Sequence, residues 1–301
     1  MVELHLLNFI HGGMTSLMCK NCDHENNAKD GICTIKNAGD GIPVRCVGGW
    51  SREKLFYLKR YVDTFTTSMR NKWKGELYYI DLFAGPGKCI VRDNEEEIDS
   101  SPLIALNAKF PFKKYYFVDL NGIALEALLK RCKSHQYEER TILLNDDCNK
   151  VVHSIVENIP KLSLSMAFID PTGLDFKFAT VEKLAHRKVD LIITYPDSMA
   201  ISRNLPKFLR EEHCSLDDFI GDSGWRKCKS LREVTEYYKK KLHSLDYQEI
   251  MQADEIQIRS LAKNLPLYTL FFASKHPLGK RFWQEISEIN HTGQRKLKFS
   301  L

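Results

Sequence analysis

The stretch Leu77-Tyr78-Tyr79-Ile80-Asp81-Leu82-Phe83-Ala84-Gly85-Pro86-Gly87 decides the fold. Its first seven residues are mostly aromatic and aliphatic, which predicts a short buried β-strand. The run then ends in Ala-Gly-Pro-Gly, where Gly85 and Gly87 permit backbone angles and a close ligand approach that side chains would prevent. Open α/β sheets form nucleotide-type crevices where strands end in this way. The stretch predicts the border of a cofactor site, with a purely structural turn as the alternative.

Further apolar segments follow this stretch and alternate with helical patterns. The predicted strands are Tyr115–Val118, Thr141–Leu144, Met166–Ile169 and Asp190–Thr194. Such alternation is typical of a parallel, doubly wound sheet. Two later strands, within Glu249–Arg259 and at Leu267–Ala273, have no long helix between them and predict an antiparallel hairpin. The predicted fold class is α/β, a Rossmann-like, mainly parallel seven-stranded sheet that ends in this C-terminal hairpin.

Acidic residues follow the predicted strands at their carboxyl ends, which all face one crevice. Asp119 is placed to accept hydrogen bonds from the ribose of an adenosine-bearing cofactor, or to cap the next helix. Asp146 or Asp147 can bind an adenine amino group, or cap the helix that follows. Asp170 and Pro171 bring a carboxylate and a rigid turn to the same edge. Together with the glycine turn, these acids predict one small-molecule site.

Residues 1–49 form a Cys-rich segment in which hydrophobic periodicity is nearly absent. Cys19 and Cys22 form a C-x-x-C pair, and Cys33 and Cys46 complete four thiolates, a set that suits tetrahedral zinc. An iron–sulfur cluster, or free cysteines on a leader, are the alternatives. We expect two domains, this segment with its zinc site and the α/β domain at residues 50–301. Met14 is an alternative start to Met1.

The composition is that of an ordinary soluble globular protein, with 301 residues, 43% of them hydrophobic and 28% charged. A net charge of +5 permits nucleic acid as a partner without requiring it. No apolar run is long enough to span a bilayer and no signal-peptide pattern opens the chain, which predicts a cytoplasmic protein without a membrane partner.

The acidic insert Lys88–Ser101 is predicted to be a solvated loop. Arg203, Lys207 and Arg210 predict either a phosphate contact or a solvated helix face.

Four motifs, taken in order, resemble the three-Cys-motif partner protein family. They are Tyr79–Gly87, Ser101–Leu106, Phe168–Leu174 and Asp218–Gly221 followed by Trp225. The resemblance implies a Rossmann-like, S-adenosylmethionine-dependent methyltransferase fold, in which a late antiparallel hairpin is expected. It also implies a partner protein that carries a separate three-cysteine motif, distinct from the four cysteines named above.

The resemblance also implies roles for residues at the crevice. Those expected around the methionine part of S-adenosylmethionine are Asp81, Phe83, Ala84, Gly85 and Gly87. Asp119 would meet the ribose, and Asp146 or Asp147 the adenine. Asp170 and Pro171 would lie at the methyl acceptor, where Asp170 takes or orients a proton.

Three functions are compatible with these patterns. The first is methyl transfer to a nucleic acid or a nucleic-acid-associated acceptor, and the second is an adaptor for the three-Cys-motif partner. The third, a nucleotide-binding oxidoreductase, is disfavoured because Ile90 stands where the G-x-G-x-x-G spacing requires its third glycine.

Overall fold

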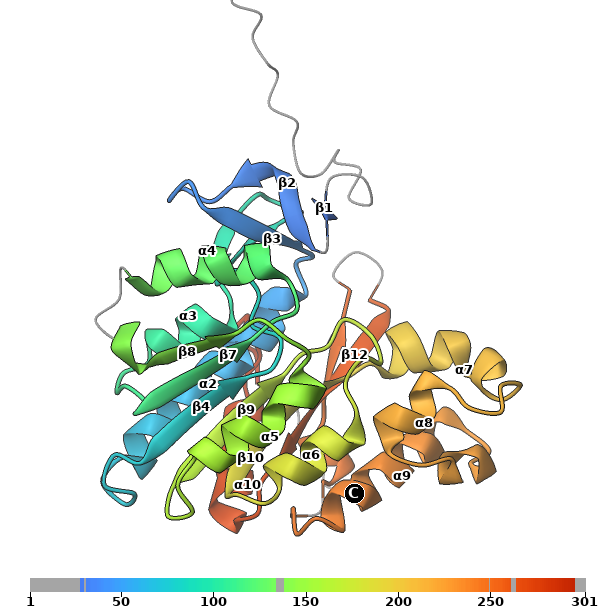
Figure 1. The fold of residues 1–301 in the computed structure, drawn as a ribbon. Helices are drawn as coiled ribbons and strands as arrows, with labels where there is room; N and C mark the ends of the chain where they lie inside the picture. The colour runs from blue at the N-terminus through green and yellow to red at the C-terminus, as the bar shows by residue number, and fades with distance from the viewer. Residues whose placement is uncertain (1–27, 30, 134–137, 249, 261–263, 296–301) are drawn as a thin grey trace, which may run out of the picture.

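The central strand of the fold is the one that the opening stretch predicts. The computed structural model describes residues 28–29, 31–133, 138–248, 250–260 and 264–295. In it β4 (Leu77–Asp81) lies inside a seven-stranded sheet with all five residues buried (Figure 1). It pairs in parallel with β7 (Lys114–Val118) and with β9 (Leu164–Ile169). A strand with parallel neighbours on both sides is covered on both faces, which explains its apolar sequence.

The strand order of the large sheet is β11-β12-β10-β9-β4-β7-β8. Here β8 (Thr141–Leu144) and β10 (Val189–Tyr195) extend the parallel part. The last two strands, β11 (Ile256–Arg259) and β12 (Pro266–Ala273), pair antiparallel with each other, and β12 pairs antiparallel with β10. The predicted Rossmann-like methyltransferase fold with its C-terminal hairpin is therefore confirmed. Because the order reverses between β4 and β9, a crevice is expected at their carboxyl ends.

Helices cover both faces of the large sheet. One face carries α2 (Ser51–Met69), α3 (Ser101–Leu106), α4 (Gly122–Lys133) and α10 (Pro277–Ser287). The other carries α5 (Cys148–Asn158), α6 (Phe178–Leu184), α8 (Ser215–Ile220) and α9 (Leu231–His243). Tyr79 packs in the first of these two cores and Ile80 in the second, since successive strand residues point to opposite faces.

Shorter helical segments complete the described chain. They are the 3₁₀ turns η2 (Glu138–Arg140), η4 (Gly224–Lys227) and η5 (Gln252–Asp254), the π-helical turn η3 (Asp197–Ser202), and α7 (Arg203–Phe208). Across the residues that the structure describes, no helix has both the length and the apolar character that a membrane crossing requires.

A second, smaller sheet stands beside α4 (Figure 1). Its order is β1 (Ala28–Lys29), β2 (Ile32–Asn37), β3 (Pro43–Val47), β5 (Lys88–Val91) and β6 (Glu97–Asp99). The prediction of a solvated loop over Lys88–Ser101 is wrong, because β3 pairs in parallel with β5. Strands from both sides of the expected boundary at residue 49 thus share this sheet, while the two-domain division itself stays a prediction.

Arg131 of α4 connects the small sheet to the glycine turn. Its side chain is almost completely buried, and it donates to both carboxylate oxygens of Asp40 at 2.9 and 3.0 Å. It also donates to the carbonyl oxygens of Ile42, Pro43 and Pro86 at 3.1, 2.8 and 2.6 Å. One side chain therefore fixes β3 and the turn after β4 relative to each other.

Candidate active site

Two cavities open next to each other at the carboxyl ends of β4 and β9. They share five lining residues, namely Gly31, Arg45, Phe83, Asp170 and Thr172. We call the first, of about 430 Å³, the basic cavity. Its charged and aromatic lining residues are Arg45, Trp50, Lys54, Phe83, Arg92, Asp170 and Tyr268. We call the second, of about 520 Å³, the acidic cavity, and its polar lining includes Asp119, Asn121, Asp146, Asp147, Asp170 and Asp175.

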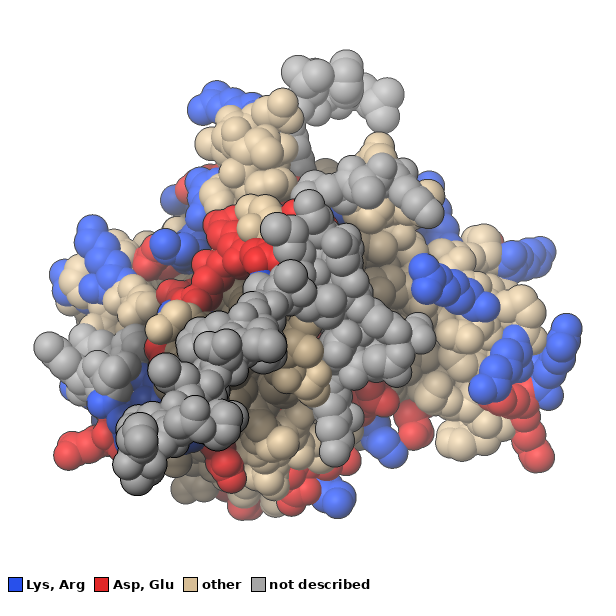
Figure 2. Space-filling model, turned by 90° about the horizontal axis from the view of Figure 1, so that it is seen from above, with Lys and Arg blue, Asp and Glu red and all other residues tan. Residues whose placement is uncertain are grey.

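The two cavities differ in charge. Among described residues, the basic cavity is lined by three cationic side chains and by Asp170 as its one carboxylate. The acidic cavity is lined by Arg45 and by the five aspartates named above. Figure 2, which views the molecule from above, shows one group of acidic side chains near the middle of this face, with further acidic side chains and many Lys and Arg side chains toward the edges. A ligand that spans both cavities therefore meets opposite electrostatic environments at its two ends.

The two glycines of the turn have different surroundings. Gly85 has φ of 63° and lines the basic cavity, and its N–H donates to Asp119 Oδ2 at 2.7 Å. Gly87 has φ of 92°, and a Cβ there would lie 3.1 Å from Leu128 Cδ1, so Gly87 faces the helices and lines neither cavity. Phe83 and Ala84, by contrast, do line the crevice. Gly85 is thus placed to approach a ligand, whereas Gly87 allows close packing.

Asp81 lies behind the turn and lines neither cavity. It is fully buried, and its Oδ1 accepts from the Phe83 N–H at 3.3 Å. Burial, aided by the nearby carboxylates of Asp170 and Asp119, raises the pKa of Asp81 to about 7. Its role in the fold is to hold the backbone between β4 and the glycine turn.

We expect the stability of the protein to record this raised pKa. The folded-state pKa of about 7 exceeds the ordinary 3.8, so the folded protein binds the Asp81 proton more tightly than the unfolded chain does. The contribution of Asp81 to stability is then fully present below pH 3.8 and is lost as the pH rises from there through about 7. Relative to Asp81→Asn, the free energy of unfolding of the wild type should fall with rising pH, by at most about 1.4 kcal/mol per pH unit. Urea denaturation of both proteins across this range measures the difference, and a constant or rising difference would contradict the assignment.

Asp119 stands at the tip of β7 and lines the acidic cavity. Its Oδ1 accepts from the Asn121 N–H at 2.8 Å, in addition to the bond from Gly85. The helix α4 is capped by Asn121, whose Oδ1 accepts from the N–H groups of Ile123 and Ala124. Asp119 therefore orders the crevice rather than the helix. Next to it Leu120, which is 70% exposed, provides an apolar wall.

Asp146 and Asp147 both line the acidic cavity but make different contacts. Asp147 caps α5, since its Oδ1 accepts from the Asn149 N–H at 2.8 Å. Asp146 is exposed, and its Oδ1 accepts from the Asp147 N–H at 2.7 Å. Of the two residues that the sequence leaves open, Asp147 has the capping role, and Asp146 is the more exposed carboxylate, with Lys150 Nζ 3.9 Å from its Oδ1.

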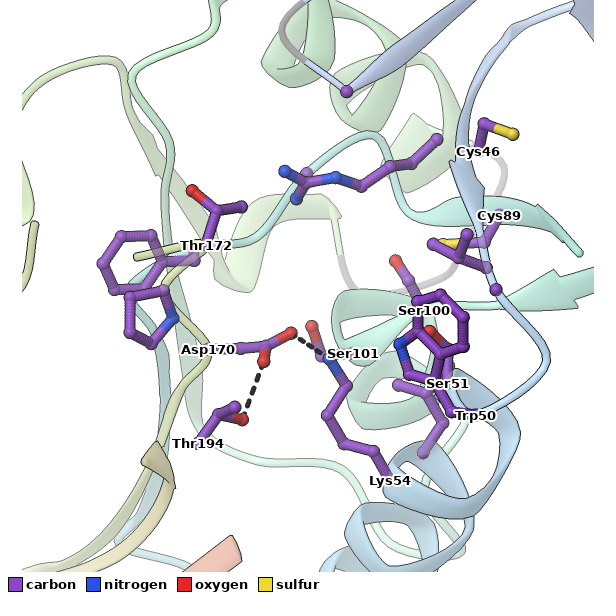
Figure 3. A pocket seen from close by; sticks show the side chains of 18 of the residues that line it. Cys46, Trp50, Ser51, Lys54, Cys89, Ser100, Ser101, Asp170, Thr172 and Thr194 are labelled. Carbon is purple, nitrogen blue, oxygen red and sulfur yellow. Dashed lines mark hydrogen bonds and ion pairs between the residues drawn. The ribbon is translucent and has the colours of Figure 1, made fainter. Parts of the chain in front are cut away.

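Asp170 is the carboxylate that both cavities share. Its Oδ1 accepts from Thr194 Oγ1 at 2.7 Å, and its Oδ2 forms an ion pair with Lys54 of α2 (Figure 3). Burial works to lower the pKa of Lys54, but the adjacent Asp170 carboxylate holds it above its usual value. Lys54 is thus a cation that stays charged and fixes the carboxylate. Pro171 lines the basic cavity next to it.

Sequence reasoning misses several residues that line the basic cavity. Lys54 lies 5.5 Å from the centre of the Tyr268 ring, and Arg92 lies 5.7 Å from that of Trp50. Figure 3 shows Trp50 across the cavity from Asp170. The available signals are weak, since Lys54 is one lysine on an amphipathic helix and Arg45 is one polar residue between the apolar Val44 and Cys46 of β3.

The cysteine prediction is tested only in part. Cys19 and Cys22 lie outside the described residues. Cys33 and Cys46 are buried in the small apolar core of the second sheet, with Val44 and Ile90. No group of three or more His, Cys, Asp or Glu residues in the described part of the chain is arranged to hold a metal ion. The zinc site therefore stays a prediction.

The solved structures that are similar to this chain share little of its sequence. A scan against protein-family models and a search of curated proteins each found no match. Among solved structures, a Legionella pneumophila protein is 11% identical with a TM-score of 0.46, over 76% of this chain and 89% of that one. The methyltransferase domain of a bacterial Hen1 protein is 12% identical with a TM-score of 0.39, over 72% and 98%. The P. horikoshii protein TYW2, solved in complex with MeSAdo, is 13% identical with a TM-score of 0.38, over 82% and 73%.

The resemblance to the three-Cys-motif partner family stays a prediction beside these comparisons. The strand order and pairing of the large sheet give the chain a methyltransferase-like fold.

Proposed function

We propose that the chain is an S-adenosylmethionine-dependent methyltransferase that acts on a nucleic acid or a nucleic-acid-associated acceptor. One observation carries the proposal: an acidic and a basic cavity meet at Asp170, beside Gly85, at the carboxyl ends of β4 and β9. This is the place where open α/β sheets bind nucleotide-type cofactors.

The residues of the acidic cavity fit the adenosine part of the cofactor. Asp119 and Asp146 offer carboxylate oxygens for ribose hydroxyls and for an adenine amino group, and the exposed Leu120 offers apolar surface to the base. The methionine part would then pass Phe83, Ala84 and Gly85 toward the basic cavity. When bound, S-adenosylmethionine supplies an electrophilic methyl group. The protein must then align an acceptor with that methyl group and remove a proton.

Asp170 is the residue of this chain best placed to orient the acceptor. It lies at the junction of the two cavities, and the contacts with Lys54 and Thr194 fix the direction of its carboxylate. An oriented carboxylate can accept a hydrogen bond from an acceptor N–H or O–H, and can take the proton as the new bond forms. The surplus of positive charge in the basic cavity favours an acceptor that carries anionic groups.

A second candidate function is a cofactor-binding adaptor for a three-Cys-motif partner protein. The observation that favours it is that both oxygens of Asp170 already have partners, Oδ1 in Thr194 and Oδ2 in Lys54. An acceptor must therefore compete with Thr194 and Lys54 for this carboxylate. The adaptor would bind the cofactor and transfer no methyl group.

Calorimetry with S-adenosylmethionine and S-adenosylhomocysteine tests the proposal. We expect both to bind, and Asp119→Ala to weaken binding by about 10-fold or more, as expected for a lost hydrogen bond to a charged group. Glu182→Ala, which removes an exposed carboxylate from α6, is the control and should bind as the wild type does. Thermal unfolding of each variant shows whether it is folded.

Transfer of a labelled methyl group to mixed DNA and RNA then separates the two functions. Transfer supports the methyltransferase, and binding without transfer supports the adaptor. A folded protein that binds neither compound at millimolar concentration would rule out both.

A further inference from the structure

We infer that the small sheet recognises the acceptor, and that Arg45 and Arg92 together bind a phosphate group of a nucleic acid in the basic cavity. The inference deepens the proposed function and depends on it for the identity of the acceptor. It assigns a binding role to the sheet in which β2 and β3 of the Cys-rich segment lie beside β5 and β6 of the acidic insert. The basic residues that the sequence singles out, Arg203, Lys207 and Arg210, lie outside both cavities.

Arg45 reaches the crevice from β3 between two glycines. A Cβ on Gly31 would lie 2.8 Å from Arg45 Nε, and a Cβ on Gly85 would lie 3.7 Å from Arg45 Nη1. The guanidinium therefore lies close to the glycine turn, in a space that a side chain at Gly31 would obstruct. It borders both cavities, and among described residues it has no ion pair or hydrogen bond.

Arg92 follows β5, the strand that pairs with β3, and lies over Trp50 at the start of α2. An arginine stacked on an aromatic ring keeps its N–H donors available in the plane of the guanidinium. The described part of the chain offers this guanidinium no acidic partner either. Of the two cavities, Arg92 lines only the basic one.

The charges of the basic cavity indicate how many anions it can take. Lys54 is neutralised by Asp170, so Arg45 and Arg92 remain as two uncompensated cations. The carboxylate of the cofactor is balanced by the ammonium group of the same amino-acid part, so both cations stay available to the acceptor. Guanidinium groups bind phosphate through paired hydrogen bonds. Trp50 adds aromatic surface on which a base can stack, and this favours a nucleic acid over an acidic protein.

The test measures binding of short, mixed-sequence, fluorescein-labelled DNA and RNA oligonucleotides by anisotropy, over a range of salt and with or without S-adenosylhomocysteine. We expect Arg45→Ala and Arg92→Ala each to weaken binding by about 10-fold, and to reduce the slope of log affinity against log salt by about 0.7 to 1. Arg92→Lys should keep the salt slope and lose part of the affinity, because lysine keeps the charge but lacks the paired N–H donors of a guanidinium. Arg281→Ala on α10, which removes an exposed arginine paired with Glu285, is the matched control and should bind as the wild type does.

Calorimetry with S-adenosylhomocysteine on the same variants distinguishes the sources of the anion. Arg92→Ala should keep cofactor affinity within about 2-fold of the wild type. A change of this size is smaller than the loss of one hydrogen bond to a charged group would cause. The inference is overturned if both alanine variants bind oligonucleotides like the wild type, if they lose only cofactor affinity, or if a glutamate-rich peptide binds where oligonucleotides do not. Oligonucleotide binding measured without cofactor tests the inference independently of the proposed function. Failure of the wild type to bind the cofactor would instead count against the proposed function.

Discussion

Asp170→Asn is expected to lower the rate of methyl transfer by about 100-fold or more, the scale of a lost general base, while S-adenosylhomocysteine still binds. The substitution keeps the size of the side chain and can still accept from Thr194, so the shape of the junction is preserved. It removes the charge that faces both cavities and the group that can take a proton. Single-turnover transfer from labelled S-adenosylmethionine, compared with calorimetric binding, measures the two effects separately.

The substitution also affects Lys54, whose side chain is only 12% exposed. Asp170→Asn leaves the Lys54 ammonium without a carboxylate partner, which destabilises the protein for reasons unrelated to catalysis. The double variant Lys54→Met with Asp170→Asn removes both charges and should recover stability without recovering transfer. Asp63→Asn, at a half-buried position of α2 outside both cavities, keeps an oxygen that can accept from the Lys109 N–H and should change neither quantity. Transfer at the wild-type rate by a folded Asp170→Asn protein would exclude Asp170 as the proton acceptor.

The sequence predicts the parts of the site that depend on local signals. Consecutive apolar residues identify β4, glycines mark the turn after it, and an acid followed by proline marks the end of β9. These features place Gly85 and Asp170 at one edge of the sheet, where the structure also has them. Lys54 could not be predicted in this way, because it meets Asp170 through a contact 116 residues away in the chain.

The small sheet shows the other limit of sequence reasoning. Its strands β3 and β5 are separated by the whole of α2 and β4, and each is short, so their pairing depends on the tertiary fold. The acidic residues around Glu97 indicate a loop locally, although Glu97 belongs to β6. Cys33 and Cys46 satisfy the ligand types for zinc, yet a cysteine is also a small apolar residue, and here both pack with Val44.

Arg131→Ala should lower the free energy of unfolding by about 3 kcal/mol, the scale of losing the hydrogen bonds of one buried charged side chain. The side chain is 3% exposed, and its loss leaves Asp40 and three carbonyl oxygens without their shared donor. Lys130→Ala, on the exposed side of the same helix, is the matched control and should change stability by less than about 0.5 kcal/mol. Urea denaturation followed by tryptophan fluorescence measures both.

The pH dependence of this loss identifies its cause. Burial works to raise the pKa of Asp40, but the hydrogen bond and charge of Arg131 hold it below its ordinary 3.8. The ion pair therefore contributes stability above that value and loses it as the pH falls further, so the difference between wild type and Arg131→Ala should shrink in acid. The bonds to the carbonyl oxygens do not titrate and should leave a remainder. Because one of these carbonyls belongs to Pro86, next to Gly85, the variant should also bind S-adenosylhomocysteine more weakly at temperatures where it is folded. Full cofactor affinity in a destabilised Arg131→Ala protein would show that the small sheet stabilises the fold without positioning the turn.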